Sequence, residues 1–111
     1  MWNQLTQIDQ LDEVAEKSFD RPVFIFKHST RCGISRMVLK NFEKQYRLTE
    51  NDVQPYFLDL LNHRDVSNEI ATRFGVVHQS PQIVLLKNGE CRYTASHGEI
   101  DAEELKEKIR S

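Results

Sequence analysis

The apolar residues of the chain recur at spacings that alternate between those of helices and those of strands. The first set returns every three or four residues, which predicts an amphipathic helix. It consists of Ile8, Leu11, Val14, Ala15 and Phe19. Residues 23–26 instead form an unbroken run of Val, Phe, Ile and Phe, which is typical of a strand buried on both faces.

After a polar turn at residues 29–33, the pattern predicts two further helix–strand alternations and a hairpin. The expected elements are helices over 34–46, 62–74 and 101–110 and strands over 53–61, 83–86 and 91–95. The apolar face of the second helix should comprise Ile34, Met37, Val38, Phe42 and Tyr46. Between the last two strands, Asn88-Gly89 supplies the positive φ angles that a two-residue hairpin turn requires.

The resulting order, α-β-α-β-α-β-β-α, predicts an α/β protein with a thioredoxin-like fold. Its first βαβ unit implies two parallel strands joined by a right-handed crossover, and the hairpin adds an antiparallel pair. We therefore expect a mixed four-stranded sheet flanked by helices on both faces. No repeat or Pro-, Gly- or Ser-rich linker interrupts the chain, so residues 1–111 are expected to form one domain.

Composition narrows the possible partners and location. Fifteen basic and 17 acidic side chains give a net charge of −2, which favours neither nucleic acid nor an anionic membrane as a partner. No apolar run approaches the ~20 residues needed to span a bilayer, and the first residues lack the features of a signal peptide. We therefore expect a cytoplasmic protein without a structural disulfide between Cys32 and Cys91.

Cys32 is the candidate reactive group, because it follows the first predicted strand and precedes the second predicted helix. Ligands of open α/β sheets gather at this edge, and free N–H groups at a helix start favour an anion. Such sites lower a thiol pKa from about 8.5 to roughly 3.5–7.5, and the thiolate is the nucleophile of disulfide exchange. Arg31 and Arg36 can add to this effect, and Gly33 leaves the sulfur accessible.

Ser35 stands where a dithiol oxidoreductase would carry its second cysteine. Cys32 therefore needs another molecule to resolve its mixed disulfide, unless Cys91 approaches it. Ser35 either donates a hydrogen bond to Cys32 or is an ordinary residue of the first helical turn. In thioredoxin-like folds a cis proline faces the active-site cysteine, and Pro81 matches it. Ser80 would then offer its backbone to an extended substrate.

Several segments together resemble the YtxJ family, the monothiol bacilliredoxins. Residues 27–35 read Lys-His-Ser-Thr-Arg-Cys-Gly-Ile-Ser, against the usual Lys-His-Ser-Thr-x-Cys-Pro-Ile-Ser of that family, and 78–83 read His-Gln-Ser-Pro-Gln-Ile. The resemblance implies a thiol that removes bacillithiol, or a similar low-molecular-weight thiol, from S-thiolated cytosolic proteins. Cys32 would carry the thiol, and free bacillithiol, a co-substrate rather than a bound cofactor, would release it.

Roles are assigned accordingly. Cys32 and Ser35 are the expected catalytic residues, and His28 and Arg36 are candidate stabilisers of the thiolate. The expected substrate-binding residues are Thr30, Arg31, Gly33, Ser80 and Pro81. No metal site is expected, because the four histidines match no zinc pattern.

Alternatives remain open because Gly33 replaces the usual proline. The resulting Cys-Gly-Ile-Ser resembles the Cys-Gly-Phe-Ser of monothiol glutaredoxins, which bind an iron–sulfur cluster with glutathione, although their Gly-Gly-x-Asp-like segment is missing. The spacing of His28, Cys32 and Arg36 also resembles glutaredoxin-type arsenate reductases, without their arginine-bearing insertion. A protein that stores a thiol on Cys32 without turnover is a further possibility.

Overall fold

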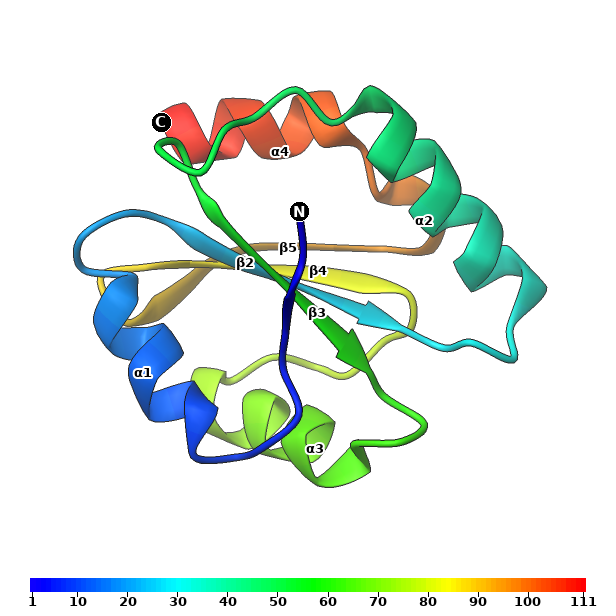
Figure 1. Ribbon diagram of the computed structural model, residues 1–111, viewed down its shortest axis with the longest axis horizontal. Helices are drawn as coiled ribbons and strands as arrows, with labels where there is room; N and C mark the ends of the chain where they lie inside the picture. The colour runs from blue at the N-terminus through cyan, green and yellow to red at the C-terminus, as the bar shows by residue number, and fades with distance from the viewer.

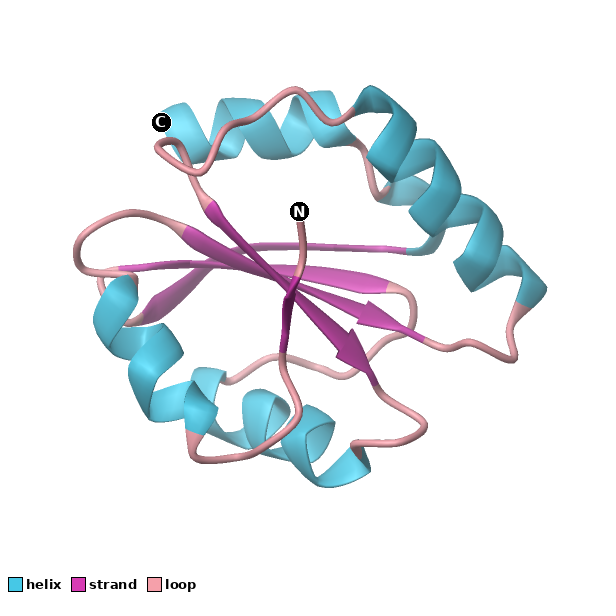
Figure 2. Cartoon of the chain, in the orientation of Figure 1, coloured by secondary structure: helices cyan, strands magenta, loops and turns pink.

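A computed structural model describes all residues, Met1–Ser111, as one mixed sheet covered by helices on both faces. The strands are β1 (Asn3–Gln4), β2 (Val23–His28), β3 (Gln54–Asp59), β4 (Gln82–Lys87) and β5 (Glu90–Ser96). The helices are α1 (Gln10–Lys17), α2 (Gly33–Gln45), α3 (Arg64–Phe74) and α4 (Ala102–Arg110), with a 3₁₀ turn η1 (His97–Glu99). Helices α1 and α3 cover one face, and α2 and α4 cover the other (Figures 1 and 2).

The strand order is β1-β3-β2-β4-β5, with β1, β3 and β2 parallel and β4 and β5 antiparallel to their neighbours. This confirms the thioredoxin-like fold and corrects the expected four strands to five. The additional strand, β1, pairs with β3 through Asn3↔Tyr56 and Gln4↔Phe57. It was missed because its two residues are polar and exposed, so no hydrophobic period marks them.

The core forms two layers because β2 is buried on both faces. Val23 and Ile25 pack against the α1 and α3 side, whereas Phe24 and Phe26 pack against the α2 and α4 side. Side chains of successive strand residues point to opposite faces, so an unbroken apolar run supplies both layers. Trp2 seals the second layer, with its ring 5.7 Å from that of Phe24.

The predicted Asn88-Gly89 hairpin turn is confirmed, and residues suited to helix ends cap α3 and α4, although α3 begins after His63 rather than at Asn62 or Asp65. Asn88 and Gly89 have φ angles of 53° and 76°, as the hairpin turn needs, and Gly75 ends α3 at φ 65°. Asp101 caps α4 by accepting a hydrogen bond from the Glu103 N–H (3.2 Å). No helix combines the length and apolar character that crossing a bilayer demands.

Some apolar residues assigned to helix faces are exposed instead. Ile34 and Met37 are 59% and 58% exposed, because α2 buries a different stripe that includes Ser35 and Phe42. Phe19 is 63% exposed because α1 ends at Lys17. Ile8, which precedes that helix, is 36% exposed. For Ile8 and Phe19 the helical period was extended past the ends of α1, whereas Ile34 and Met37 lie within α2 but beside its buried stripe.

Candidate functional site

Cys32 lies at the N-terminus of α2, where it is the N-cap residue with φ −97° and ψ 119°. Its thiol is free and partly exposed. The N–H groups of Gly33, Ile34 and Ser35 have no acceptor within the protein, whereas Arg36 N–H begins the helical bonding by donating to Cys32 O (3.1 Å). A helix start with open N–H groups stabilises negative charge, so these groups can stabilise an anionic sulfur.

Ser35 is fully buried beneath this turn and joins α2 to the end of β2. Its Oγ lies 2.8 Å from His28 Nδ1 and accepts a hydrogen bond from the Ser29 N–H (3.1 Å). No hydrogen bond joins Ser35 to Cys32. Ser35 therefore holds the loop between His28 and the helix. Because its oxygen already accepts from Ser29, its hydroxyl hydrogen is available for donation to His28 Nδ1.

His28 is buried at the end of β2. Burial lowers its pKa, the Arg36 charge lowers it further, and the Asp59 carboxylate opposes both by raising it. Asp59 is the neighbour of His28 in β3, and its Oδ1 is buried without a hydrogen-bond partner. The sequence did not identify Asp59 as a neighbour of His28, because a single acidic residue at the end of an apolar strand belongs to no recognisable motif.

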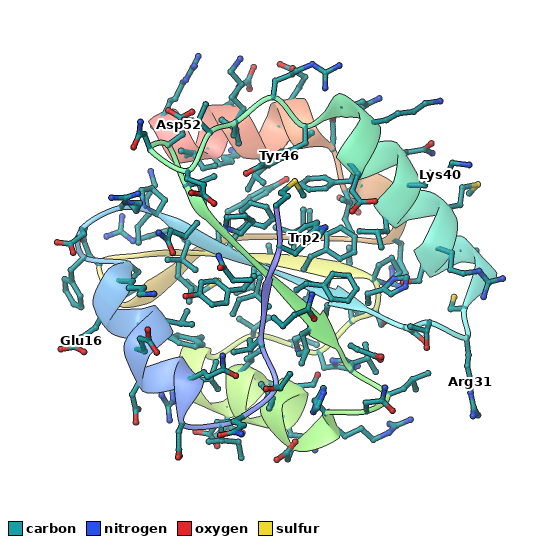
Figure 3. All side chains as sticks on the ribbon, in the orientation of Figure 1. Trp2, Glu16, Arg31, Lys40, Tyr46 and Asp52 are labelled. Atoms are coloured by element: carbon teal, nitrogen blue, oxygen red, sulfur yellow. The ribbon has the colours of Figure 1, made fainter.

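The loop that carries Cys32 is braced from one side and open on the other. Arg36 Nη1 donates to Thr30 O (2.9 Å), whereas the Arg31 side chain extends from the loop into solvent (Figure 3). A methyl group added at Gly33 would meet only Arg36 Nη2, at an ordinary 3.8 Å. Arg36 is therefore placed as a structural brace, and Arg31 is free to meet a partner.

Ser80 and Pro81 lie at the same end of the sheet as the loop that carries Cys32, because Gln82 is the register partner of Lys27 at the end of β2. The Ser80–Pro81 peptide bond is cis, as expected, and Pro81 is buried. Neither the N–H nor the C=O of Ser80 has a partner within the protein, and its Oγ is buried and unpaired. An unpaired backbone segment of this kind can bond to an extended chain laid beside it.

A second polar cluster, formed by the buried Lys27 and Ser67 and the exposed His78, lies on the opposite face of β2. Lys27 is 0% exposed, and its Nζ lies 3.4 Å from Ser67 O and 3.3 Å from His78 Nδ1. Ser67 Oγ lies 3.4 Å from the same ring nitrogen. Burial lowers the pKa of Lys27 to about 8. The sequence did not mark Lys27 as a site residue, because a lysine directly after an apolar run is usually the exposed polar end of a strand.

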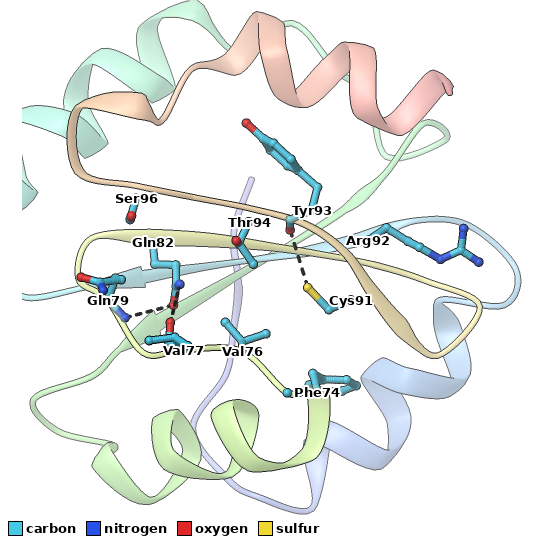
Figure 4. Close-up of a pocket in the computed structure, with 11 residues that line it drawn as sticks. Phe74, Val76, Val77, Gln79, Gln82, Cys91, Arg92, Tyr93, Thr94 and Ser96 are labelled. Carbon is cyan, nitrogen blue, oxygen red and sulfur yellow. Dashed lines mark hydrogen bonds between the residues drawn. The ribbon is translucent and has the colours of Figure 1, made fainter.

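Cys91 is remote from Cys32. It pairs with Leu86, which pairs with Val23 at the start of β2, and His28 lies five residues further along that strand. At ~3.3 Å per residue this is about 16 Å, whereas disulfide formation needs Cα atoms within ~7 Å. Burial raises the pKa of the Cys91 thiol, which lies beside a groove of about 590 Å³ (Figure 4). The folded protein therefore cannot resolve Cys32 with Cys91.

The structure contains neither a cluster of metal ligands nor a cavity lined by Cys32. No three His, Cys, Asp or Glu side chains lie together so that they could hold a metal ion. None of the surface cavities is lined by Cys32, which is partly exposed.

Known proteins share both this geometry and the sequence pattern. A solved structure of a provisionally assigned oxidoreductase with a thioredoxin fold is 36% identical, covers 95% of this chain and 90% of that chain, and superposes with a TM-score of 0.80. Thioredoxins from Malassezia sympodialis and Fasciola hepatica are 24% and 18% identical, with TM-scores of 0.74 and 0.73. They cover 99% of this chain and 89% and 97% of their own, and they show the fold alone.

The family comparison is more specific than the fold. The model that describes monothiol bacilliredoxin BrxC matches residues 3–105, which include the loop of Cys32, the Ser80-Pro81 segment and every strand. Cys32 lies at a helix start and no second thiol lies within reach of it, as expected for a monothiol protein. The chain therefore belongs to the monothiol bacilliredoxin BrxC family and is a thiol oxidoreductase of the thioredoxin fold.

Proposed function

We propose that the protein is a monothiol disulfide reductase that removes bacillithiol from S-bacillithiolated cytosolic proteins. The Cys32 thiolate attacks the bacillithiol sulfur of the mixed disulfide. A Cys32–bacillithiol disulfide forms, the protein–bacillithiol disulfide breaks, and the protein sulfur leaves as a thiolate that takes a proton from water. The target protein is reduced by this exchange, and Cys32 now carries the oxidised bond.

Release requires a second molecule of bacillithiol. Its thiolate attacks the bacillithiol sulfur on Cys32, which yields bacillithiol disulfide and regenerates the Cys32 thiolate. Across the two steps, the transferred and the incoming bacillithiol leave as one disulfide, so the incoming bacillithiol is oxidised and the target cysteine returns to a thiol. The separation of about 16 Å along the strands that keeps Cys91 away from Cys32 supports this external route.

The single observation that carries the proposal is an accessible thiol at the start of α2, with a buried Ser35 where a dithiol enzyme has its second sulfur. The open Ser80 backbone supports a polypeptide substrate, because its unpaired N–H and C=O can bond to a chain beside Cys32. The family description supports bacillithiol as the small thiol.

A peptide with one cysteine in a disulfide with bacillithiol tests the proposal. Mass spectrometry should show the bacillithiol adduct on Cys32 of the wild type and its loss when excess bacillithiol is added. Cys32→Ala should leave the peptide unchanged, and Cys91→Ala should behave as the wild type. Removal of bacillithiol by Cys32→Ala would refute the mechanism.

Three further outcomes separate the alternatives. An adduct that forms on Cys32 but persists in excess bacillithiol would indicate thiol storage rather than turnover. A coloured protein after anaerobic reconstitution with iron, sulfide and glutathione would favour a cluster carrier. A faster reaction with a glutathione disulfide of the same peptide would indicate that glutathione, rather than bacillithiol, is the small thiol that the protein removes. The chemistry proposed for Cys32 would be the same.

A further inference from the structure

His78 has a ring whose two nitrogens face different surroundings. Its Nδ1 points inward, 3.3 Å from Lys27 Nζ and 3.4 Å from Ser67 Oγ, although the residue as a whole is exposed. An ammonium group has three donors and no acceptor, so a hydrogen bond from Lys27 requires an unprotonated Nδ1. In the neutral ring the proton then lies on Nε2, the other ring nitrogen.

The two contacts of this nitrogen come from two other elements of the fold. Lys27 belongs to β2, Ser67 to α3 and His78 to the loop before β4, and Lys27 Nζ lies 3.4 Å from Ser67 O. Lys27 and Arg64 both lower the pKa of His78, after burial, which is the largest cause. No carboxylate contacts the ring to favour a second proton.

The fixed ring lies at the active-site end of the sheet. The loop that holds His78 and Ser80 enters β4 beside the end of β2, from which the loop of Cys32 leaves, and Figure 1 shows the two loops at one end of the molecule. Ser80 presents an unpaired backbone there, and Val77 is 79% exposed. A polypeptide laid along Ser80 would therefore also pass the His78 ring and cover an apolar side chain.

We propose that His78 contacts the polypeptide part of the mixed disulfide by donating its Nε2–H to a backbone carbonyl, and that Lys27 is the positioning residue that holds the ring for this contact. The proposal extends the proposed function, because it names a group that recognises the target protein rather than the small thiol. It involves no covalent step, since the ring keeps its proton throughout.

The tautomer is tested on the free protein. Long-range ¹H–¹⁵N correlation spectra of the ¹⁵N-labelled wild type should show His78 with its proton on Nε2. Lys27→Met should give a mixture of tautomers. A proton on Nδ1 in the wild type, or an unchanged spectrum in Lys27→Met, would overturn the positioning role of Lys27.

The contact is tested with a peptide whose cysteine is activated as a thionitrobenzoate disulfide, which reports attack by Cys32 without any bacillithiol. His78→Asn keeps an acceptor near Lys27 and loses the outward donor, so its rate should fall roughly three- to tenfold, the value of one hydrogen bond. His78→Gln restores a donor near the Nε2 position and should stay within about twofold of the wild type.

A small disulfide without a peptide, 2-hydroxyethyl disulfide, should react at the wild-type rate with both variants. His63→Asn, at another histidine near this end of the sheet, serves as the control for the substitution itself. Equal losses in His78→Asn and His78→Gln, or an equal loss with the small disulfide, would refute the contact. These results are independent of the proposed function, which is tested separately with the bacillithiol disulfide and the Cys32→Ala variant.

Discussion

Lys27 places an ammonium group inside the protein without a carboxylate partner. Its contacts are a carbonyl oxygen and a ring nitrogen, both at the outer limit of hydrogen bonding, and burial is the cause of its lowered pKa. Removing a charge from water without an ion pair costs stability. The same side chain that aligns His78 is therefore expected to destabilise the fold.

Replacing Lys27 by Met keeps the volume of the side chain and removes the charge. The free energy of unfolding at pH 7 should rise by about 1–3 kcal/mol, measured by urea denaturation. The folded pKa is about 8 and the unfolded value 10.5, so between them the unfolded chain binds a proton that the folded protein does not. Wild-type stability should therefore gain from this group as pH rises from 8 toward 10.5.

The difference between the two proteins isolates Lys27 from other groups that titrate at high pH. The advantage of Lys27→Met should be largest below pH 8 and shrink toward pH 10. An advantage that stays constant across this range would show that the pKa of Lys27 is not lowered in the folded protein.

Ser35 makes the buried hydrogen bonds that hold the Cys32 loop. In Ser35→Ala the Ser29 N–H and His28 Nδ1 lose their partner, and an unsatisfied buried polar group costs about 1–3 kcal/mol. We expect the free energy of unfolding to fall by this amount, as judged by thermal and urea unfolding. Asn41→Ala, on an exposed position of the same helix, is the control and should change stability by less than ~0.5 kcal/mol.

The residues of the site differ in how visible they are in the sequence. Cys32, Ser35 and Pro81 were predicted because each lies next to a turn or helix start whose chemistry is local. The partners of Lys27 come from α3 and the loop before β4, 40 and 51 positions away, so no local spacing reveals the contact. Tertiary contacts of this kind require the fold.

At the scale of elements, the backbone at the start of α2 determines which residues can follow Cys32. Cys32 is the N-cap, so Gly33 is the first helical position, where proline is favoured. Cys32 already has the extended backbone that precedes a proline, and the Gly33 N–H has no partner to lose. The backbone therefore accepts either residue, and Gly33 does not by itself separate this chain from relatives that carry proline.

Gly33→Pro should consequently stabilise the protein by about 0.4–1 kcal/mol, because it restricts the unfolded chain without straining the folded one. Differential scanning calorimetry measures the shift in melting temperature. Gly33→Ala offers the comparison, since its methyl group also fits beside Arg36. A destabilised Gly33→Pro would mean that this N–H has a partner in solution.

The elements that the sequence predicted well are those with a strong period or an obligatory turn residue. The apolar run of β2 and the Asn88-Gly89 turn leave little choice of structure, and both formed as expected. β1 depends instead on pairing with β3, because two polar residues have no intrinsic reason to extend. Ile34 and Met37 share the helical period of α2 but lie beside the buried stripe, a distinction that only the packing decides.

At the scale of the molecule, the sheet keeps its two sulfurs at opposite ends. Cys91 pairs across β4 with the start of β2, and Cys32 follows the end of β2. Oxidation of the protein alone by diamide should therefore give dimers linked through Cys32 rather than an internal disulfide. Non-reducing electrophoresis and mass spectrometry of the digested dimer measure the linkage. Cys91→Ala should dimerise as the wild type, and Cys32→Ala should remain monomeric. An internal Cys32–Cys91 disulfide formed under native conditions would require opening of the sheet, and its detection would contradict the external resolution on which the proposed cycle depends.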